Sequence, residues 1–123
     1  MRVVDTSIWI DFWRGRASVS GLAELLREGH VLMHPWVLGE VALGSLGSRR
    51  GAILDDLAQL PASPVVPVGE LLAFVEHHRL AGSGLGFVDV QILASTRLAN
   101  AELWTGDRRL LEAWRRLATR DMA

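Results

Sequence analysis

The sequence contains no cysteine and no lysine among its 123 residues. Without cysteine, the chain cannot form disulfides, thiolate zinc sites or a cysteine nucleophile. All 13 basic residues are arginine, whose planar guanidinium suits phosphate groups, although a GC-rich genome is the simpler explanation. No apolar run approaches the roughly 20 residues of a membrane span, and Asp5 and Asp11 interrupt the region where a signal peptide would be apolar. We therefore expect a cytoplasmic bacterial or archaeal protein with no membrane partner.

Charge and composition say little about a binding partner. The net charge is −1, so no overall basic field favours nucleic acid, and any such function has to come from local features. Half of the residues are hydrophobic, which is enough for a core and argues against disorder. At this length we expect one domain that spans residues 1–123.

Predicted strands and helices alternate along the chain. Short apolar segments predict strands at 2–5, 30–34, 64–68 and 102–105. Apolar residues at helical spacing predict helices at 7–15, 19–29, 35–46, 48–60, 69–81, 87–101 and 106–118, with a flexible break at 82–86. This alternation is typical of an α/β fold with a mainly parallel sheet and helices on both of its faces.

Most of the 14 acidic residues lie on polar helix faces, but four do not. Asp5 ends an apolar strand, and Asp107 follows the last predicted strand. Glu40 is the one charged residue of a helix that is otherwise apolar nearly all round, which predicts that its carboxylate is buried.

The fourth unusual carboxylate is Asp89, in the first turn of the predicted helix at 87–101. It shares a side of that helix with the apolar Ile92. Gln91 and Ser95 form the polar side, which is expected to point elsewhere. Asp89 therefore belongs with the carboxylates that a solvated surface does not explain.

Each of these four carboxylates has a structural alternative. Asp5 and Asp107 can cap helices, Asp89 can stabilise a helix N-terminus, and Glu40 can form an ion pair in the core. Together, however, strand ends and helix starts converge at the carboxyl edge of an open α/β sheet, where ligands bind. Carboxylates gathered there repel one another, and a hard cation such as Mg²⁺ or Mn²⁺ removes that repulsion. The residues thus indicate a metal-dependent phosphodiester hydrolase.

Four segments resemble the motifs of PIN-domain nucleases, and most closely those of the VapC toxins of bacterial toxin–antitoxin pairs: "VVDTSIWID", "HPWVLGEVALG", "GLGFVDVQILAS" and "AELWTGDRRL". The resemblance covers essentially the whole chain. It implies a three-layer α/β/α sandwich with a central, mainly parallel sheet of four to five strands. It also implies an Mg²⁺- or Mn²⁺-dependent endoribonuclease, the toxin of a VapBC-type system, that hydrolyses RNA phosphodiester bonds with metal-activated water. The alternative is a non-toxin PIN-domain nuclease in RNA processing.

The resemblance also assigns roles to individual residues. Asp5 and Asp89 would be direct metal ligands, while Glu40 and Asp107 would act directly or through water, so that all four form the catalytic site. Neighbouring hydroxyl groups would orient the carboxylates and waters. These groups belong to Thr6, Ser7 and Thr105.

The arginines are open to two interpretations. Arg14, Arg16, Arg108 and Arg109 lie near the predicted site and would bind RNA phosphates or remain solvated surface, with equal weight for each. The other arginines on predicted helix surfaces are expected to be plain surface residues: Arg49, Arg50, Arg115, Arg116 and Arg120.

Partners follow mainly from the resemblance. Trp9 and Trp13 lie on one helix face, where they are first expected in the core and second in a groove for a VapB-like antitoxin. RNA is the implied substrate, and a homodimer using the helix at 69–81 is also implied. The histidines lack metal-site spacing, and "EHHR" is expected to be exposed. A third hypothesis is an α/β binding module whose carboxylates only cap helices, so that divalent metal would not change its melting temperature.

Overall fold

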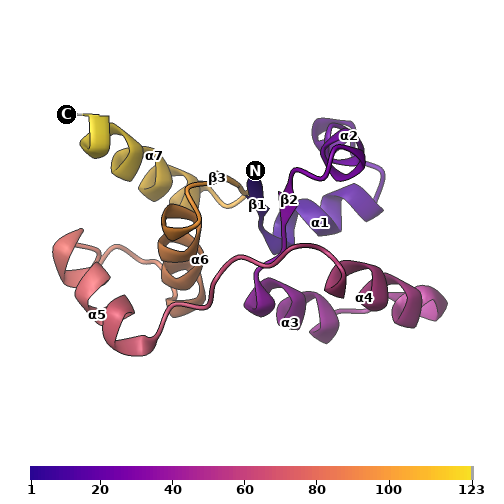
Figure 1. Cartoon of the computed structure of the whole chain (residues 1–123), viewed down its shortest axis with the longest axis horizontal. Coiled ribbons are helices and arrows are strands. Elements are labelled where there is room, and N and C mark those ends of the chain that lie inside the picture. The colour runs from indigo at the N-terminus through magenta and orange to yellow at the C-terminus, as the bar shows by residue number, and fades with distance from the viewer. Residues whose placement is uncertain (123) are drawn as a thin grey trace.

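The computed structural model describes residues 1–122 (Figure 1). Its strands are β1 (Arg2–Val4), β2 (Val31–Leu32) and β3 (Glu102–Trp104). Its helices are α1 (Thr6–Trp13), α2 (Leu22–Arg27), α3 (Pro35–Leu43), α4 (Arg50–Ala58), α5 (Val68–His77), α6 (Phe87–Leu98) and α7 (Arg108–Met122). Two short 3-10 helices precede α2 and α4, namely η1 (Ala17–Val19) and η2 (Gly47–Arg49). All of the predicted helices are present, with ends shifted by a few residues.

The strands form a parallel sheet in the order β2–β1–β3. Val3 of the central strand lies opposite Leu32 of β2 and Leu103 of β3. Val3 and Val4 have no exposed surface, as expected for a strand that is covered on both faces. In Figure 1, α1 to α4 lie to one side of the strands and α5 to α7 to the other. The prediction of an α/β fold with a parallel sheet is confirmed.

The predicted strand at 64–68 is wrong, and the described residues form a sheet of three strands rather than four or five. The backbone of this segment binds a side chain instead of a strand. Val66 N donates to Gln91 Oε1 at 2.7 Å, and Gln91 Nε2 donates to Val66 O at 3.0 Å. The two prolines of the segment have no N–H to offer a neighbouring strand. A single parallel bridge, between Met33 and Ala62, marks where the chain leaves the margin of the sheet.

The middle of α6 is buried all round, from Val90 to Thr96. The prediction that Gln91 and Ser95 form a separate polar side is therefore wrong, because both have no exposed surface. A second bond joins Gln91 Oε1 to His34 Nε2 at 3.2 Å, and Ser95 Oγ donates to Pro64 O at 2.6 Å. These partners explain how polar side chains are accommodated inside the core.

The first helix packs its aromatic side chains into the core. Trp9 is only 1% exposed, which confirms its expected place in the core. Its Nε1 donates to Val4 O at 3.2 Å, and its ring stacks on Trp13, with ring centroids 5.8 Å apart. Trp13 is half-buried, so one side of it remains available at the surface. Within residues 1–122, no helix combines the length and apolar character needed to cross a membrane.

Candidate catalytic site at the carboxyl edge of the sheet

Asp5 directly follows the central strand β1, and its side chain is half-buried. The parallel pairing of β1 with β3 brings Thr105 beside it. Thr105 Oγ1 donates to Asp5 Oδ2 at 2.7 Å, and Asp5 N donates to Trp104 O at 2.9 Å. Asp5 occupies the N-cap position of α1 but makes no side-chain capping bond there. Helix capping therefore does not explain this carboxylate.

The electrostatic environment of Asp5 opposes its ionisation. Burial raises the pKa of Asp5 above its ordinary value of 3.8. The Thr105 hydroxyl and the Thr6 N–H lower the pKa, but they do not offset the burial, and the carboxylates of Glu40 and Asp89 raise the pKa further. Ionised Asp5 is thus held at an electrostatic cost, which a nearby cation would relieve.

Glu40 is exposed, so the prediction that its carboxylate is buried is wrong. In α3 only Val37 and Val41 are buried, and Leu43 at the end of the helix is 90% exposed. The apolar composition of α3 did not show which of its faces another element covers. Glu40 nevertheless reaches the edge of the sheet, because Thr6 Oγ1 donates to Glu40 Oε1 at 2.9 Å.

Asp89 lies half-buried in the first turn of α6. Its Oδ2 accepts a hydrogen bond from Gly86 N at 2.9 Å, which ties the preceding loop to the helix. An anion at this position is also stabilised by the helix dipole. The structural alternative therefore holds for Asp89. At the same time its charge contributes to the raised pKa of Asp5.

Asp107 caps the last helix, as its structural alternative predicts. Leu110 N donates to Asp107 Oδ1 at 3.1 Å. The backbone N–H of Asp107 donates to Thr105 Oγ1 at 3.0 Å, and the same hydroxyl donates to Asp5. Asp107 is exposed and is not among the charges that shift the pKa of Asp5. It is connected to the site through Thr105.

All three predicted hydroxyl groups form hydrogen bonds at this edge of the sheet. Thr6 binds Glu40, and Thr105 binds Asp5. Ser7 Oγ accepts a hydrogen bond from Gly106 N at 3.0 Å. A Cβ atom at Gly106 would lie 3.3 Å from Ser7 Oγ, so this close approach favours glycine. The hydroxyls therefore connect α1, α3 and the loop after β3.

The described His, Asp and Glu residues contain no group of three or more that could hold a metal ion as the side chains stand. The donor chemistry at the sheet edge nevertheless fits a hard divalent cation, since it consists of oxygen atoms from carboxylates and hydroxyls. A cation beside Asp5 would also lower its raised pKa.

Arg14 and Arg16 lie differently with respect to the site. Arg14 borders, together with Glu40, a groove of about 400 Å³ between α1, α3 and α4. Arg16 forms an ion pair with Asp11 at 3.2 Å. Of these two arginines, Arg14 is the one that lies beside a candidate catalytic carboxylate.

Arg108 and Arg109 are exposed in the first turn of α7, directly after Asp107. Arg109 Nη1 donates to Gly84 O at 3.4 Å. Gly84 has a φ of 85°, a left-handed backbone conformation that favours glycine. The arginine thereby holds the loop that leads into α6.

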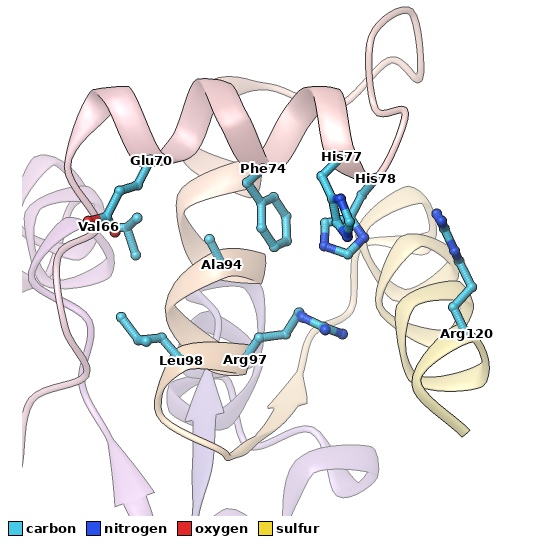
Figure 2. A pocket seen from close by; sticks show the side chains of 9 residues that line it. All are labelled: Val66, Glu70, Phe74, His77, His78, Ala94, Arg97, Leu98 and Arg120. Carbon is cyan, nitrogen blue, oxygen red and sulfur yellow. The ribbon is translucent and has the colours of Figure 1, made fainter. Parts of the chain in front are cut away.

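A separate cavity of about 550 Å³ lies among α5, α6 and α7 (Figure 2). His77 and His78 enter it from the end of α5, Arg97 from α6 and Arg120 from α7. None of the four candidate catalytic carboxylates lines it. The expected exposure of "EHHR" holds for His77, whereas His78 is half-buried.

The sequence patterns did not identify the polar network around Gln91. This residue joins α6 to Val66 and to His34, and it thereby fixes the segment that had been predicted as a strand. The available signal was a glutamine within a strongly apolar helix, with Ser95 one turn later. Such a pair suits a buried backbone segment that lacks a strand partner.

The PIN domain family matches residues 2–115 of the chain. The chain therefore belongs to the PIN domain family. It is also similar to two proteins named Ribonuclease VapC32, from Mycobacterium tuberculosis strains CDC 1551 / Oshkosh and ATCC 25618 / H37Rv. Each is 46% identical over 114 residues, which cover 92% of this chain and 90% of the relative. The sequence-based resemblance to PIN-domain, VapC-like ribonucleases is confirmed.

Proposed function

We propose that this chain is an Mg²⁺- or Mn²⁺-dependent endoribonuclease and the toxin of a VapBC-type system, formed by one PIN-like domain of three α/β/α layers across residues 1–123. Membership of the PIN domain family and the similarity to two ribonucleases support RNA as the substrate. The observation that carries the chemistry is the carboxyl group of Asp5, whose pKa is raised by burial and by the charges of Glu40 and Asp89. A perturbed carboxyl group at the carboxyl edge of an α/β sheet supports a functional site.

In the proposed site, Asp5 and Asp89 bind the metal directly, and Glu40 and Asp107 bind it directly or through water. These four residues form the catalytic set. When bound, a divalent cation neutralises the carboxylates, activates water and stabilises negative charge on a scissile phosphate.

The chain's own hydroxyl groups position the acidic residues. Thr105 donates to Asp5 and accepts from the N–H of Asp107, so one side chain fixes two acidic residues relative to each other. Thr6 orients Glu40 from the first turn of α1. Groups that are held in place before the reaction need little reorganisation during it, which favours catalysis.

Replacement of Asp5 or Asp89 by asparagine tests this assignment. Each variant should lose at least about a hundredfold in metal-dependent RNA cleavage, because a metal ligand is weakened. Circular dichroism should show an unchanged fold. Asp55→Asn, at an exposed position of α4, is a matched control and should cleave like the wild type. Wild-type cleavage by the Asp5→Asn/Asp89→Asn double variant would show that the assignment is wrong.

The groove beside Glu40 supports a VapB-like antitoxin as partner. Trp13 and Ile53 give it apolar walls, while Arg14 and Glu40 border it. An antitoxin segment bound there would lie over Glu40 and obstruct the catalytic site. Expression of the chain should arrest growth, and co-expression of the antitoxin should relieve the arrest. The alternative function in RNA processing predicts cleavage without growth arrest.

Exposed apolar side chains support the proposed homodimer. Val68 and Leu72 of α5 and Leu98 of α6 are each more than half exposed. Burial of such surface between two copies would be favourable. Light scattering should give twice the mass of one chain, and Leu72→Glu should reduce that mass by half. We place the protein in the cytoplasm, where its proposed substrate is found.

A further inference from the structure

A groove of about 690 Å³ runs between α7 and the loop that precedes α6. The arginines that line it are Arg109, Arg115, Arg116 and Arg120, together with a single carboxylate, Glu112. Arg120 also borders the neighbouring cavity, where Figure 2 shows it on the far side of the opening from Val66 and Leu98. The groove thus extends along α7 from the first turn of the helix to Arg120.

Positive charge is concentrated on this helix. Residues 108–122 contain five of the 13 arginines but only two of the 14 acidic residues. The rest of the chain therefore has eight arginines and twelve acidic residues, although the net charge of the whole is only −1. A weakly acidic protein with one strongly basic face has a local field that attracts polyanions.

The arginines of the groove are not engaged in ion pairs within the described part of the chain. Elsewhere, arginines pair with nearby carboxylates, as Arg16 does with Asp11 and Arg27 does with Glu24. For Arg115 and Arg116, no such pair joins them to a described carboxylate. Arg116 and Arg120 lie one turn apart, and like charges at this spacing on a helix are mildly destabilising. The arrangement therefore gains little stability and suits a phosphate-rich ligand.

The groove begins in the first turn of α7, which directly follows the candidate catalytic residue Asp107, although none of the four carboxylates lines it. Asp107 caps α7 and is linked to Asp5 through Thr105, and Arg109 follows within the first turn. At the rise of an α-helix, Arg115 lies about 12 Å along the axis from Asp107, and Arg120 lies about 20 Å from it. A strand whose phosphate is held at the carboxylates would therefore meet these arginines in succession.

We propose that this groove binds the phosphate backbone of the RNA substrate on one side of the scissile bond, chiefly through Arg115 and Arg116. The proposal rests on the proposed ribonuclease function. Guanidinium groups bind phosphates through paired hydrogen bonds, and such contacts hold the strand without reading its sequence. The groove thus contributes affinity and orientation, while the carboxylates perform the reaction.

The test compares the Arg115→Ala/Arg116→Ala double variant with the wild type. With a long RNA, KM should rise about three- to tenfold with kcat unchanged, because two exposed charge contacts are lost. The slope of log affinity against log salt, measured by fluorescence anisotropy in EDTA, should fall by about 1.4, since each single-stranded contact contributes about 0.7. A dinucleotide, which has one phosphodiester and cannot fill the groove, should be cleaved equally by both proteins.

Arg27→Ala/Arg49→Ala is the matched control, because it removes the same charge near α2 and α4, on the opposite side of the molecule from α7 in Figure 1. It should retain the wild-type KM and salt slope. If the wild type cleaves RNA but the α7 variant keeps both wild-type values, the groove does not bind RNA. The same conclusion follows if the variant loses only antitoxin binding. A wild type that neither binds nor cleaves RNA would instead overturn the proposed function, and this inference with it.

Discussion

Two groups of polar side chains adjoin α6, and they differ in charge and in hydrogen bonding. At its N-terminus lies Asp89, and burial together with the charges of Glu40 and Asp89 raises the pKa of Asp5. In its middle, the neutral Gln91 has no exposed surface and makes three hydrogen bonds. Buried neutral groups with full sets of partners fix a fold, whereas clustered charges oppose it until a ligand compensates them. We therefore expect the Gln91 group to contribute mainly to stability and the acidic group to contribute mainly to ligand binding.

Removal of the Gln91 side chain should have the largest effect on stability. Gln91→Ala would leave the N–H and C=O of Val66 without their partners and would take the Oε1 atom from His34. Each buried polar group left unsatisfied costs about 1–3 kcal/mol, so the free energy of unfolding should fall by about 3 kcal/mol in urea titrations. Gln59→Ala, at an exposed position after α4, should change it by less than about 0.5 kcal/mol. If Gln91→Ala lost as little unfolding free energy as Gln59→Ala, the Gln91 group would not stabilise the fold in the way that distinguishes it from the acidic group.

Asp5→Asn is expected to change stability in the opposite direction and to raise it when no metal is present. Because burial raises the pKa of Asp5, its contribution to folding is most favourable at acidic pH and is lost as the pH rises through the folded-state pKa. Asparagine cannot ionise, so in EDTA at pH 7 the variant should melt at a higher temperature than the wild type. Mn²⁺ should then raise the melting temperature of the wild type but not of the variant. A lower melting temperature for the variant in EDTA would mean that Asp5 has a structural role.

The sequence predicted the position of Asp5 more accurately than it predicted the burial of helical residues. Asp5, between a buried strand and a helix, was expected at the edge of the sheet because strand ends and helix starts meet there. The sequence predicted that Glu40 is buried and that Gln91 lies on a separate polar side of its helix. In the structure Glu40 is exposed and Gln91 is buried. Helical periodicity shows which residues share a face, but it does not show whether another element covers that face. Those errors have this one cause, since α3 leaves Leu43 uncovered and α6 is surrounded.

The missing strand has a related physical explanation. The apolar segment at 64–68 satisfies its backbone with the side-chain amide of Gln91, 25 residues later in the chain. Strand propensity describes a backbone that needs partners, but it does not say whether those partners are strands or side chains. Only the packing of the segment against α6 decides between them.

The link between the Gln91 network and α3 should be sensitive to acid. Burial lowers the pKa of His34 below 6.5, while its Nδ1 accepts the capping hydrogen bond of Trp36 N at 2.9 Å. Its stabilising contribution is therefore complete above pH 6.5 and is lost as the pH falls from there through the folded-state pKa. Protonation would abolish the cap, which is worth about 1 kcal/mol. Between pH 7.5 and 5, the wild type should lose more stability than His34→Asn, which retains every other titratable group.

The smallest effect on stability is expected for Thr105→Val, and it tests how the acidic group is positioned. The hydroxyl donates to Asp5 and lowers its pKa, so its loss should raise that pKa further. Protonation of Asp5 would offset part of the lost hydrogen bond, which limits the change in unfolding free energy to under about 1 kcal/mol. If ionised Asp5 is required for cleavage, the acidic limb of the pH profile of kcat/KM should move to higher pH. Thr105→Ser should restore the wild-type profile, whereas an unmoved limb in the valine variant would show that Thr105 does not tune Asp5.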